Sequence, residues 1–413
     1  MHGQRIFWGV SAMFDLEHSP LGGSSAYRFL ACAFSFLEHR RQLMAETFVE
    51  IPSEYAALGT GAHELGATCL IEQTEPFEYF GKAFNGFRAG YDGEINLDAV
   101  SIYVNTCRMI IDTYGPGEVV VERTYHAKEV HPLLKGTVDF GFLTSTALHI
   151  VDYKNGEGVG VDVVDSDQLL YYAFIMILMT PGMKIREKTF PIHLTIVQPN
   201  FFGIFEDPIT WTTTLGDVLT WGWNTLLPRM NHLMKRTDAP TAEDANPGDH
   251  CQFCPVMLHC PRLKQAFLNF ARADEDFITM LPDYELDALY AERVYARRFM
   301  NELDKVVYAR KVTGGNIPSA KLVDKKVTRV WKPGAPIRET FGADAVEPQK
   351  LKSPAGIEKL SSRGKEFAKE WGYKPETGAL TIAPLSDPRP EAKPRTNDKV
   401  FEKFAQDYAD AGF

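Results

Sequence analysis

The sequence lacks any hydrophobic run long enough to cross a lipid bilayer. Its longest apolar segment covers residues 169–179, which is shorter than the about 20 residues that a spanning helix needs and suits a buried helix. The first residues also lack a basic segment followed by an apolar run and a small-residue cleavage site, so we expect no signal peptide. These absences predict a cytoplasmic protein with no membrane partner.

Cysteine is scarce, with 6 residues in a chain of 413. This excludes a small secreted domain held together by disulfides. Hydrophobic residues make up 45% of the chain and charged residues 24%, which is a globular composition. The chain is long enough for two or three domains with a sizeable core.

Positive charge is also in short supply overall. The formal net charge is −10, which argues against a nucleic-acid partner because phosphate contacts need local positive charge. The distribution changes this picture, since residues 1–304 hold 23 Lys and Arg against 40 Asp and Glu, whereas residues 305–374 hold 16 against 7. A basic module therefore follows an acidic one, and it is either a separate binding surface or a solvated lysine-rich face.

Periodicity predicts an α/β protein with a mixed central sheet flanked by helices. We expect one helix that begins at Ser24 or Ser25 and carries Cys32, and another from about Ala271 to Arg310. Further helices are expected at 53–73, 96–114 and 214–236, and short β-branched strands at 117–127, 135–145, 147–155 and 190–200, with the apolar helix between the last two strands.

The stretch "HIVDYKNG", residues 149–156, places Asp152 and Lys154 on one face of an otherwise apolar strand. If residues 144–147 form a four-residue hairpin loop, Leu143 pairs with Leu148, and the same register sets Asp139 opposite Asp152. Like charges directly opposite each other are unfavourable unless a cation lies between them.

A divalent cation would make such a carboxylate pair favourable, and oxygen ligands suit Mg²⁺ or Mn²⁺. Lys154 on the same face could then orient or deprotonate a water molecule and offset charge on a phosphoryl oxygen. The alternative for Asp152 and Lys154 is an ion pair within one edge strand.

The pattern Asp-(x12)-Asp-x-Lys, preceded by "GT" and followed by Gln168-x3-Tyr172, resembles the PD-(D/E)XK nuclease superfamily, in particular its RecB-like branch. The resemblance implies a restriction-endonuclease-like fold. It makes Asp139 and Asp152 metal ligands, with the Tyr153 carbonyl as a third.

The same resemblance assigns further roles. Lys154 would be the catalytic lysine, while Gln168 and Tyr172, one helical turn apart, would contact DNA and orient the active site. The segment "LGTGAHEL" is similar to the Gly-Thr-x-x-His segment of the branch, which implies that His63 completes the metal site. Glu122 of "VVVER" falls where the branch often has another active-site acid.

The cysteines form a second pattern. Cys251, Cys254 and Cys260 are spaced C-x2-C-x5-C, and Cys32 lies far upstream. One cysteine before the core and three after it resemble the staple of AddB-type and CRISPR-adaptation nucleases, which implies a [4Fe-4S] cluster at these four thiolates. Zn²⁺ is the alternative at this site. The other two cysteines, Cys69 and Cys107, lie in apolar helical stretches and are expected to be buried free thiols.

Most of the chain resembles a phage- and prophage-encoded group of RecB-like proteins long catalogued as a domain of unknown function. The segments that carry this likeness are "PGDHCQFCPVMLHCP", "AKLVDKKVTRVW", "KSPAGIEKL" and "LTIAPLSDPRP". On this basis residues 1–270 are the nuclease core with the iron–sulfur cysteines at both ends. Residues 271–375 are a basic accessory region of α+β character, and residues 376–413 are a Pro-rich tail. The cytoplasm would be that of the bacterial host.

The resemblance implies a metal-dependent deoxyribonuclease, and a phage exonuclease that resects linear double-stranded DNA is the specific hypothesis. Its partners would be DNA and a single-strand-binding or annealing protein. A structure-specific or single-strand endonuclease would use the same residues. A catalytically idle DNA-binding or recruitment module is the alternative of another class.

Overall fold

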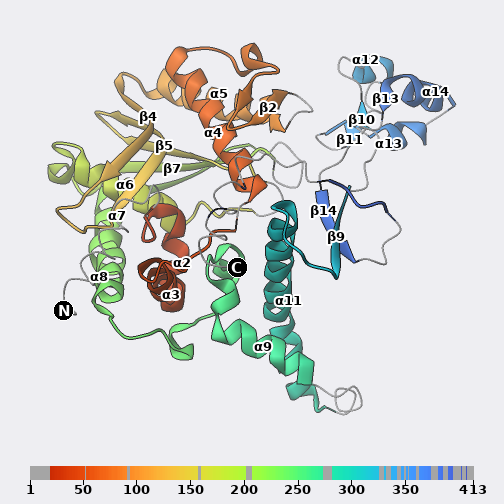
Figure 1. The fold of residues 1–413 in the computed structure, drawn as a ribbon. Coiled ribbons are helices and arrows are strands. Elements are labelled where there is room, and N and C mark those ends of the chain that lie inside the picture. Colours follow the sequence, from red (N-terminus) through yellow and green to blue (C-terminus); the bar gives the residue numbers. More distant parts are fainter. Residues whose placement is uncertain are drawn as a thin grey trace.

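The structure is a computed structural model (Figure 1). It describes residues 19–51, 53–90, 94–156, 160–200, 207–272, 281–324, 330–331, 336–341, 346–347, 350–351, 353–359, 362–373, 380–384, 389–393, 401 and 406. Within these residues, no helix combines the length and the apolar character that a membrane span requires.

A five-stranded mixed sheet forms the centre of the molecule. The sequence predicts a mixed central sheet and four of these strands, while the strand at Ile209–Thr214 is additional. The strand order of the sheet is β4-β5-β6-β7-β8, and only β6 and β7 run parallel. The strands are β4 (Gly117–His126), β5 (Lys135–Thr144), β6 (Leu148–Tyr153), β7 (Pro191–Val197) and β8 (Ile209–Thr214). All six positions of β6 are buried, which explains its nearly continuous apolar sequence.

Helices cover both faces of this sheet (Figure 1). One core contains the buried faces of α2 (Ala26–Ala31), α3 (Ala33–Met44), α6 (Asp167–Met179), α7 (Leu215–Trp221) and α8 (Leu227–Lys235). The core on the other face contains α4 (Glu54–Glu72) and α5 (Leu97–Tyr114). The sheet is therefore the middle layer of three.

Local sequence signals account for the ends of the principal helices. The hydroxyl of Ser166 accepts from the Leu169 N–H at the start of α6, and Asn96 caps α5 in the same way. The apolar run of α6 is buried from Leu169 to Leu178, so it is a core helix, as its sequence predicts.

Short elements connect these layers. They are η1 (Gly23–Ser25), η2 (Pro76–Tyr79), η3 (Met183–Ile185), the π-helical turn η5 (Gly222–Leu226), η6 (Ala242–Asp244), η7 (Asp249–Phe253) and η8 (Met257–His259). A small three-stranded sheet contains β1 (Ala83–Phe84), β2 (Phe87–Gly90) and β3 (Ile95–Asn96).

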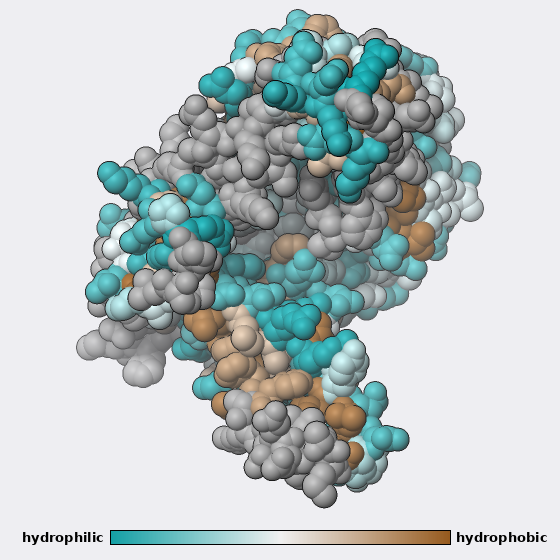
Figure 2. All heavy atoms as spheres, turned by 90° about the vertical axis from the view of Figure 1, so that its right-hand side faces the viewer, coloured by the Kyte–Doolittle hydropathy of each residue, from teal (hydrophilic) through white to brown (hydrophobic). Residues whose placement is uncertain are grey.

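An arm of two helices, α9 (Pro261–Arg272) and α11 (Asp283–Val312), projects from the core (Figure 1). The single helix predicted from Ala271 to Arg310 is wrong at its start, because α9 ends at Arg272 and α11 begins only after Pro282. Residues 273–280 lie outside the described residues. Apolar side chains are exposed along the arm (Figure 2), among them Leu286, Val294, Met300 and Leu303.

The C-terminal region combines helices and strands. Its elements are β9 (Ala320–Asp324), β10 (Val330–Trp331), α12 (Ile337–Phe341), β11 (Val346–Glu347), β12 (Lys350–Leu351), α13 (Pro354–Glu358), α14 (Ser362–Trp371), β13 (Gly372–Tyr373) and β14 (Leu380–Pro384). Ser353 caps α13 through the Gly356 N–H. Strand β14 pairs antiparallel with β9, so part of the segment predicted as a tail belongs to a sheet.

Candidate metal centre and thiol site

The β5–β6 hairpin carries the two predicted carboxylates at its open end. Leu143 pairs with Leu148, and the ladder runs to Phe140 and Val151. The hydroxyl of Thr144 closes the turn by accepting from the N–H of Ala147 at 2.9 Å. The predicted register of Leu143 with Leu148 is confirmed. Asp139 and Asp152 are the next residues beyond the last paired positions, and their direct pairing stays a prediction.

The pairing of β4 with β5 is interrupted at Glu122, whose φ is +44°. Phe140 packs in the core with α4 and α5, whereas Val138 packs in the core with α6. Val138 and Phe140 are two residues apart, and on a regular strand such residues face the same side. The alternation of side chains is therefore reset at Asp139. The reset turns Glu122 and Asp139 toward α4.

This break allows His63 of α4 to meet both carboxylates. His63 Nδ1 lies 3.2 Å from Glu122 Oε1 and 3.5 Å from Asp139 Oδ2. The three ligand atoms lie within 4.8 Å of one another. The backbone N–H of Tyr153 donates to Asp139 Oδ2 at 2.8 Å, which fixes the orientation of that carboxylate. One imidazole nitrogen and two carboxylates are a suitable ligand set for a divalent transition metal or Mg²⁺.

A second group of side chains approaches from the α6 face of the sheet. Lys154 Nζ lies 2.8 Å from Asp152 Oδ2 and donates to Gln168 Oε1 at 3.1 Å. Gln168 Nε2 donates to Asp152 Oδ1 at 3.0 Å and to Tyr172 Oη at 3.1 Å. Asp152 is thus bonded to Lys154 and Gln168 and is not a member of the close three-ligand group. Every side chain predicted for this site lies in one of the two groups. Tyr153 contacts Asp139 through its backbone N–H, and the role of its carbonyl as a metal ligand stays a prediction.

The four predicted cysteines also lie together. They form a small apolar cluster with Phe34, Val256, Met257 and Leu263, and all four are free thiols. Cys251 lies in η7, while Cys254 and Cys260 follow the last residues of η7 and η8. The predicted helix through Cys32 is wrong, because Cys32 is extended, with φ −136° and ψ 112°, and separates α2 from α3. This break lets its sulfur reach the C-terminal motif.

The remaining two cysteines are buried free thiols, as predicted, and lie in the core of α4 and α5. Burial raises the pKa of Cys69 to about 11 and raises that of Cys107 well above its ordinary value. Neither thiol contributes to the four-cysteine cluster.

A family model for proteins of unknown function, DUF2800, matches residues 18–390. The chain belongs to the DUF2800 family. The matched range contains His63, Asp139 and Lys154 as well as all four clustered cysteines. The two sites therefore lie inside the region that defines DUF2800.

The candidate metal centre of this DUF2800 protein is rich in carboxylates. Burial raises the pKa of Asp139 to about 7, the Asp152 and Glu122 charges add to this rise, and His63 opposes it. Burial opposes the protonation of His63, but Asp139 and Glu122 outweigh it and raise its pKa to about 9. Burial likewise opposes the charge on Lys154, and the two aspartates raise its pKa. Each carboxylate favours a cation nearby, which is the electrostatic condition for metal binding.

Two features of the DUF2800 sites are absent from the sequence prediction. The Glu122 backbone conformation has no local signal, because nothing in "VVVERTY" demands a positive φ. The second feature is a pair of backbone N–H groups that contact the thiols. The Asn246 N–H donates to Cys32 Sγ at 3.5 Å, and the Gly248 N–H donates to Cys251 Sγ at 3.4 Å. The Asn-Pro-Gly run before the cysteine motif is the signal that could have indicated a turn there.

Proposed function

We propose that this DUF2800 protein is a divalent-metal-dependent deoxyribonuclease of the PD-(D/E)XK type. One observation carries the proposal. A half-buried lysine, Lys154, is held by Asp152 and Gln168 beside a sheet break that gathers His63, Glu122 and Asp139. A divalent metal bound next to a fixed ammonium group can promote phosphodiester hydrolysis.

Each side chain has a role that follows from its contacts. When bound, Mg²⁺ or Mn²⁺ supplies Lewis acidity and lowers the pKa of a water ligand. His63, Glu122 and Asp139 would hold this ion, and Asp152 lies beside them. Lys154 offsets negative charge that develops on a phosphoryl oxygen.

Gln168 and Tyr172 act through their neighbours. Gln168 accepts from Lys154 and donates to Asp152, so it fixes the distance between the ammonium and the carboxylate. Tyr172 accepts from Gln168 and is packed against the backbone of Gly23, where an added Cβ would lie 2.5 Å from its ring. Both residues keep the site in place before DNA binds.

We further propose a [4Fe-4S] cluster at Cys32, Cys251, Cys254 and Cys260, with a structural role in joining the two ends of the core. Tetrahedral zinc would hold its sulfurs about 3.8 Å apart, from Zn–S bonds of about 2.3 Å. Among the described residues, the carboxylate–histidine group brings three ligand atoms within 4.8 Å of one another, and the cysteines do not. No three of the four cysteine sulfurs, all of which belong to described residues, meet that limit, and this favours an inorganic core larger than one ion.

The specific proposal is an exonuclease that resects linear double-stranded DNA and works with a single-strand-binding or annealing protein. Support comes from the charge distribution, since the basic residues 305–374 follow the acidic core. Such a module would bind the phosphate backbone without reading sequence, and its affinity would fall steeply with salt.

The test compares linear with closed circular DNA, each with Mg²⁺ and with Mn²⁺. The wild-type protein, Lys154→Ala and the exposed control Lys184→Ala are assayed together. We expect wild type and Lys184→Ala to degrade linear DNA and Lys154→Ala to be inactive although folded. Cleavage of circular DNA would show an endonuclease instead, and no cleavage with either metal would support an idle binding module.

A further inference from the structure

The loop between α8 and the cysteine motif, residues 236–248, presents N–H groups to two of the clustered thiols. The Asn246 N–H donates to Cys32 Sγ and the Gly248 N–H donates to Cys251 Sγ. An N–H donor stabilises a thiolate, and such contacts tune the stability and potential of metal–thiolate sites. The position of this loop therefore matters to whatever the thiols hold.

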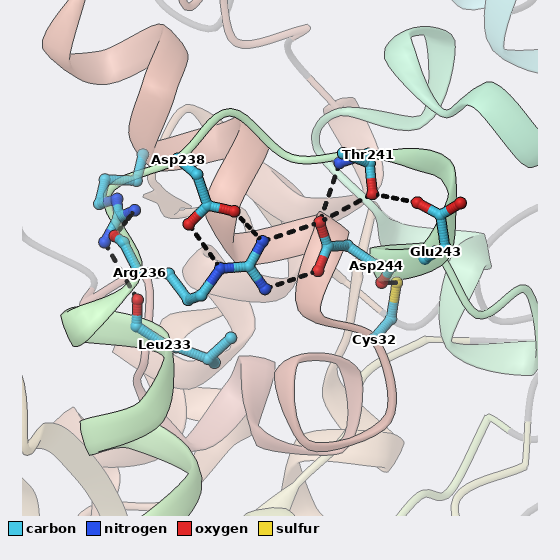
Figure 3. Close-up of polar contacts among 8 residues, drawn as sticks. Cys32, Leu233, Arg236, Asp238, Thr241, Glu243 and Asp244 are labelled. Atoms are coloured by element: carbon cyan, nitrogen blue, oxygen red, sulfur yellow. Dashed lines mark hydrogen bonds and ion pairs between the residues drawn. The ribbon is translucent and has the colours of Figure 1, made fainter.

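Arg236 closes the loop by bridging its two sides (Figure 3). Its Nε and Nη2 donate to Asp238 at 2.7 and 2.6 Å. Its Nη1 and Nη2 donate to Asp244 at 2.8 and 3.2 Å. Asp244 also accepts from the Thr241 N–H at 2.8 Å, and its backbone carbonyl lies 3.8 Å from Cys32 Sγ. The planar guanidinium matches two carboxylates at once, which a lysine would not do.

Arg236 is itself anchored to the helix that follows Cys32. Arg40 of α3 donates to the backbone carbonyls of Leu233, at 3.1 Å, and of Arg236. These carbonyls lie at the end of α8, where they have no partner within the helix. The contacts form a closed path from Cys32 through α3 to Arg236, and back through Asp244 to the Cys32 sulfur.

The two carboxylates differ in exposure. The side chain of Asp238 is 61% exposed, whereas that of Asp244 is 10% exposed. An exposed ion pair contributes little to global stability. Of the two carboxylates, Asp244 is the one whose residue also contacts a thiol, because its backbone carbonyl lies next to Cys32 Sγ.

We propose that Arg236 is a positioning residue for the thiol site, acting through Asp244 to fix the loop whose N–H groups contact Cys32 and Cys251. The inference rests on the proposed metal cluster at these cysteines. The proposed role of Arg236 is to retain the bound metal. This role is separate from the folding of the core and from the chemistry at Lys154.

The experiment compares wild type with Arg236→Met, Asp244→Asn and the matched control Asp238→Asn, all purified without oxygen. Iron and zinc per chain, visible absorbance, release of metal to a chelator and the alkylation rate of Cys32 are measured. We expect Arg236→Met and Asp244→Asn to release metal about 10–100-fold faster than wild type, with faster alkylation of Cys32. Asp238→Asn should behave like wild type.

The outcomes separate the two proposals. Iron in wild type with equal release from all four proteins would overturn the role of Arg236 and leave the cluster standing. Zinc in place of iron would contradict the iron–sulfur proposal, while the same comparison of zinc release would still decide on Arg236. Wild type with neither metal would contradict both. If Arg236→Met fails to fold, Asp244→Asn, which keeps the side-chain size, decides the question.

Discussion

The strained conformation of Glu122 predicts an inversion of the usual effect of glycine in a strand. A side chain at a φ of +44° is strained, at a cost of about 1–3 kcal/mol for a residue in such a region. Glu122→Gly and Glu122→Ala both lose the carboxylate and its contact with His63. The difference in their free energies of unfolding therefore reports the cost of the backbone conformation. In an ordinary strand, glycine is less stable than alanine by about 0.5–1 kcal/mol.

At position 122 we expect the reverse order. The relief of strain, about 1–3 kcal/mol, exceeds the entropic cost of glycine, so Glu122→Gly should have a free energy of unfolding about 1 kcal/mol above that of Glu122→Ala. Urea unfolding in the presence of a chelator measures this difference. The chelator removes any contribution of bound metal.

Thr124 provides the matched control, because it is exposed on the same strand and its φ is not positive. Thr124→Gly should be less stable than Thr124→Ala. The reasoning is refuted if Glu122→Ala is as stable as Glu122→Gly or more so. Both Glu122 variants should also bind the proposed divalent metal about tenfold more weakly or worse, which would show that the strain serves the site.

Three further predictions concern packing, the hydrogen-bond network and pH. Gly222→Ala would place a Cβ 2.2 Å from the Phe174 ring, so we expect a loss of about 1–3 kcal/mol in thermal unfolding, and unchanged stability would contradict this contact. Gln168→Leu removes hydrogen bonds to Asp152, Lys154 and Tyr172. It should lower the free energy of unfolding by about 2–4 kcal/mol and slow single-turnover cleavage. Wild-type values in both assays would exclude a positioning role for Gln168. Burial, together with the neighbouring His193, lowers the pKa of His149 from 6.5 to about 4. Between these pH values the unfolded chain binds more protons than the folded chain, so the free energy of unfolding should fall as the pH decreases from 6.5 to 4. His149→Phe should reduce that dependence on pH.

Much of the central sheet could be predicted from local sequence. The four-residue turn and the apolar alternation of Leu148 and Ile150 fix the hairpin register, and this register brings Asp139 and Asp152 to the open end of the same hairpin. The apolar run of α6 and the i,i+4 spacing of Gln168 and Tyr172 also predict a buried helix with both polar groups on one face.

Other features depend on tertiary context and leave no local pattern. The positive φ of Glu122 lies where the pairing of β4 with β5 is interrupted and has no local signal, so the meeting of α4 with these carboxylates was predictable only by resemblance. Strand β8 was not predicted, because "ITWTTT" lacks the apolar alternation of its neighbours. The break at Cys32 carries no glycine or proline signal in "FLACAFSF", so the local sequence predicts one continuous helix where the structure has two.

The most direct test of the central claim measures Mn²⁺ binding and DNA cleavage in the same samples of wild type, Asp139→Asn and Lys154→Ala. Electron paramagnetic resonance reports the bound ion, and gel analysis of linear DNA reports cleavage. We expect wild type to bind and cut, Lys154→Ala to bind without cutting, and Asp139→Asn to do neither. A wild-type protein that binds no Mn²⁺ even with DNA present, or an Asp139→Asn protein that cuts normally, would contradict the account.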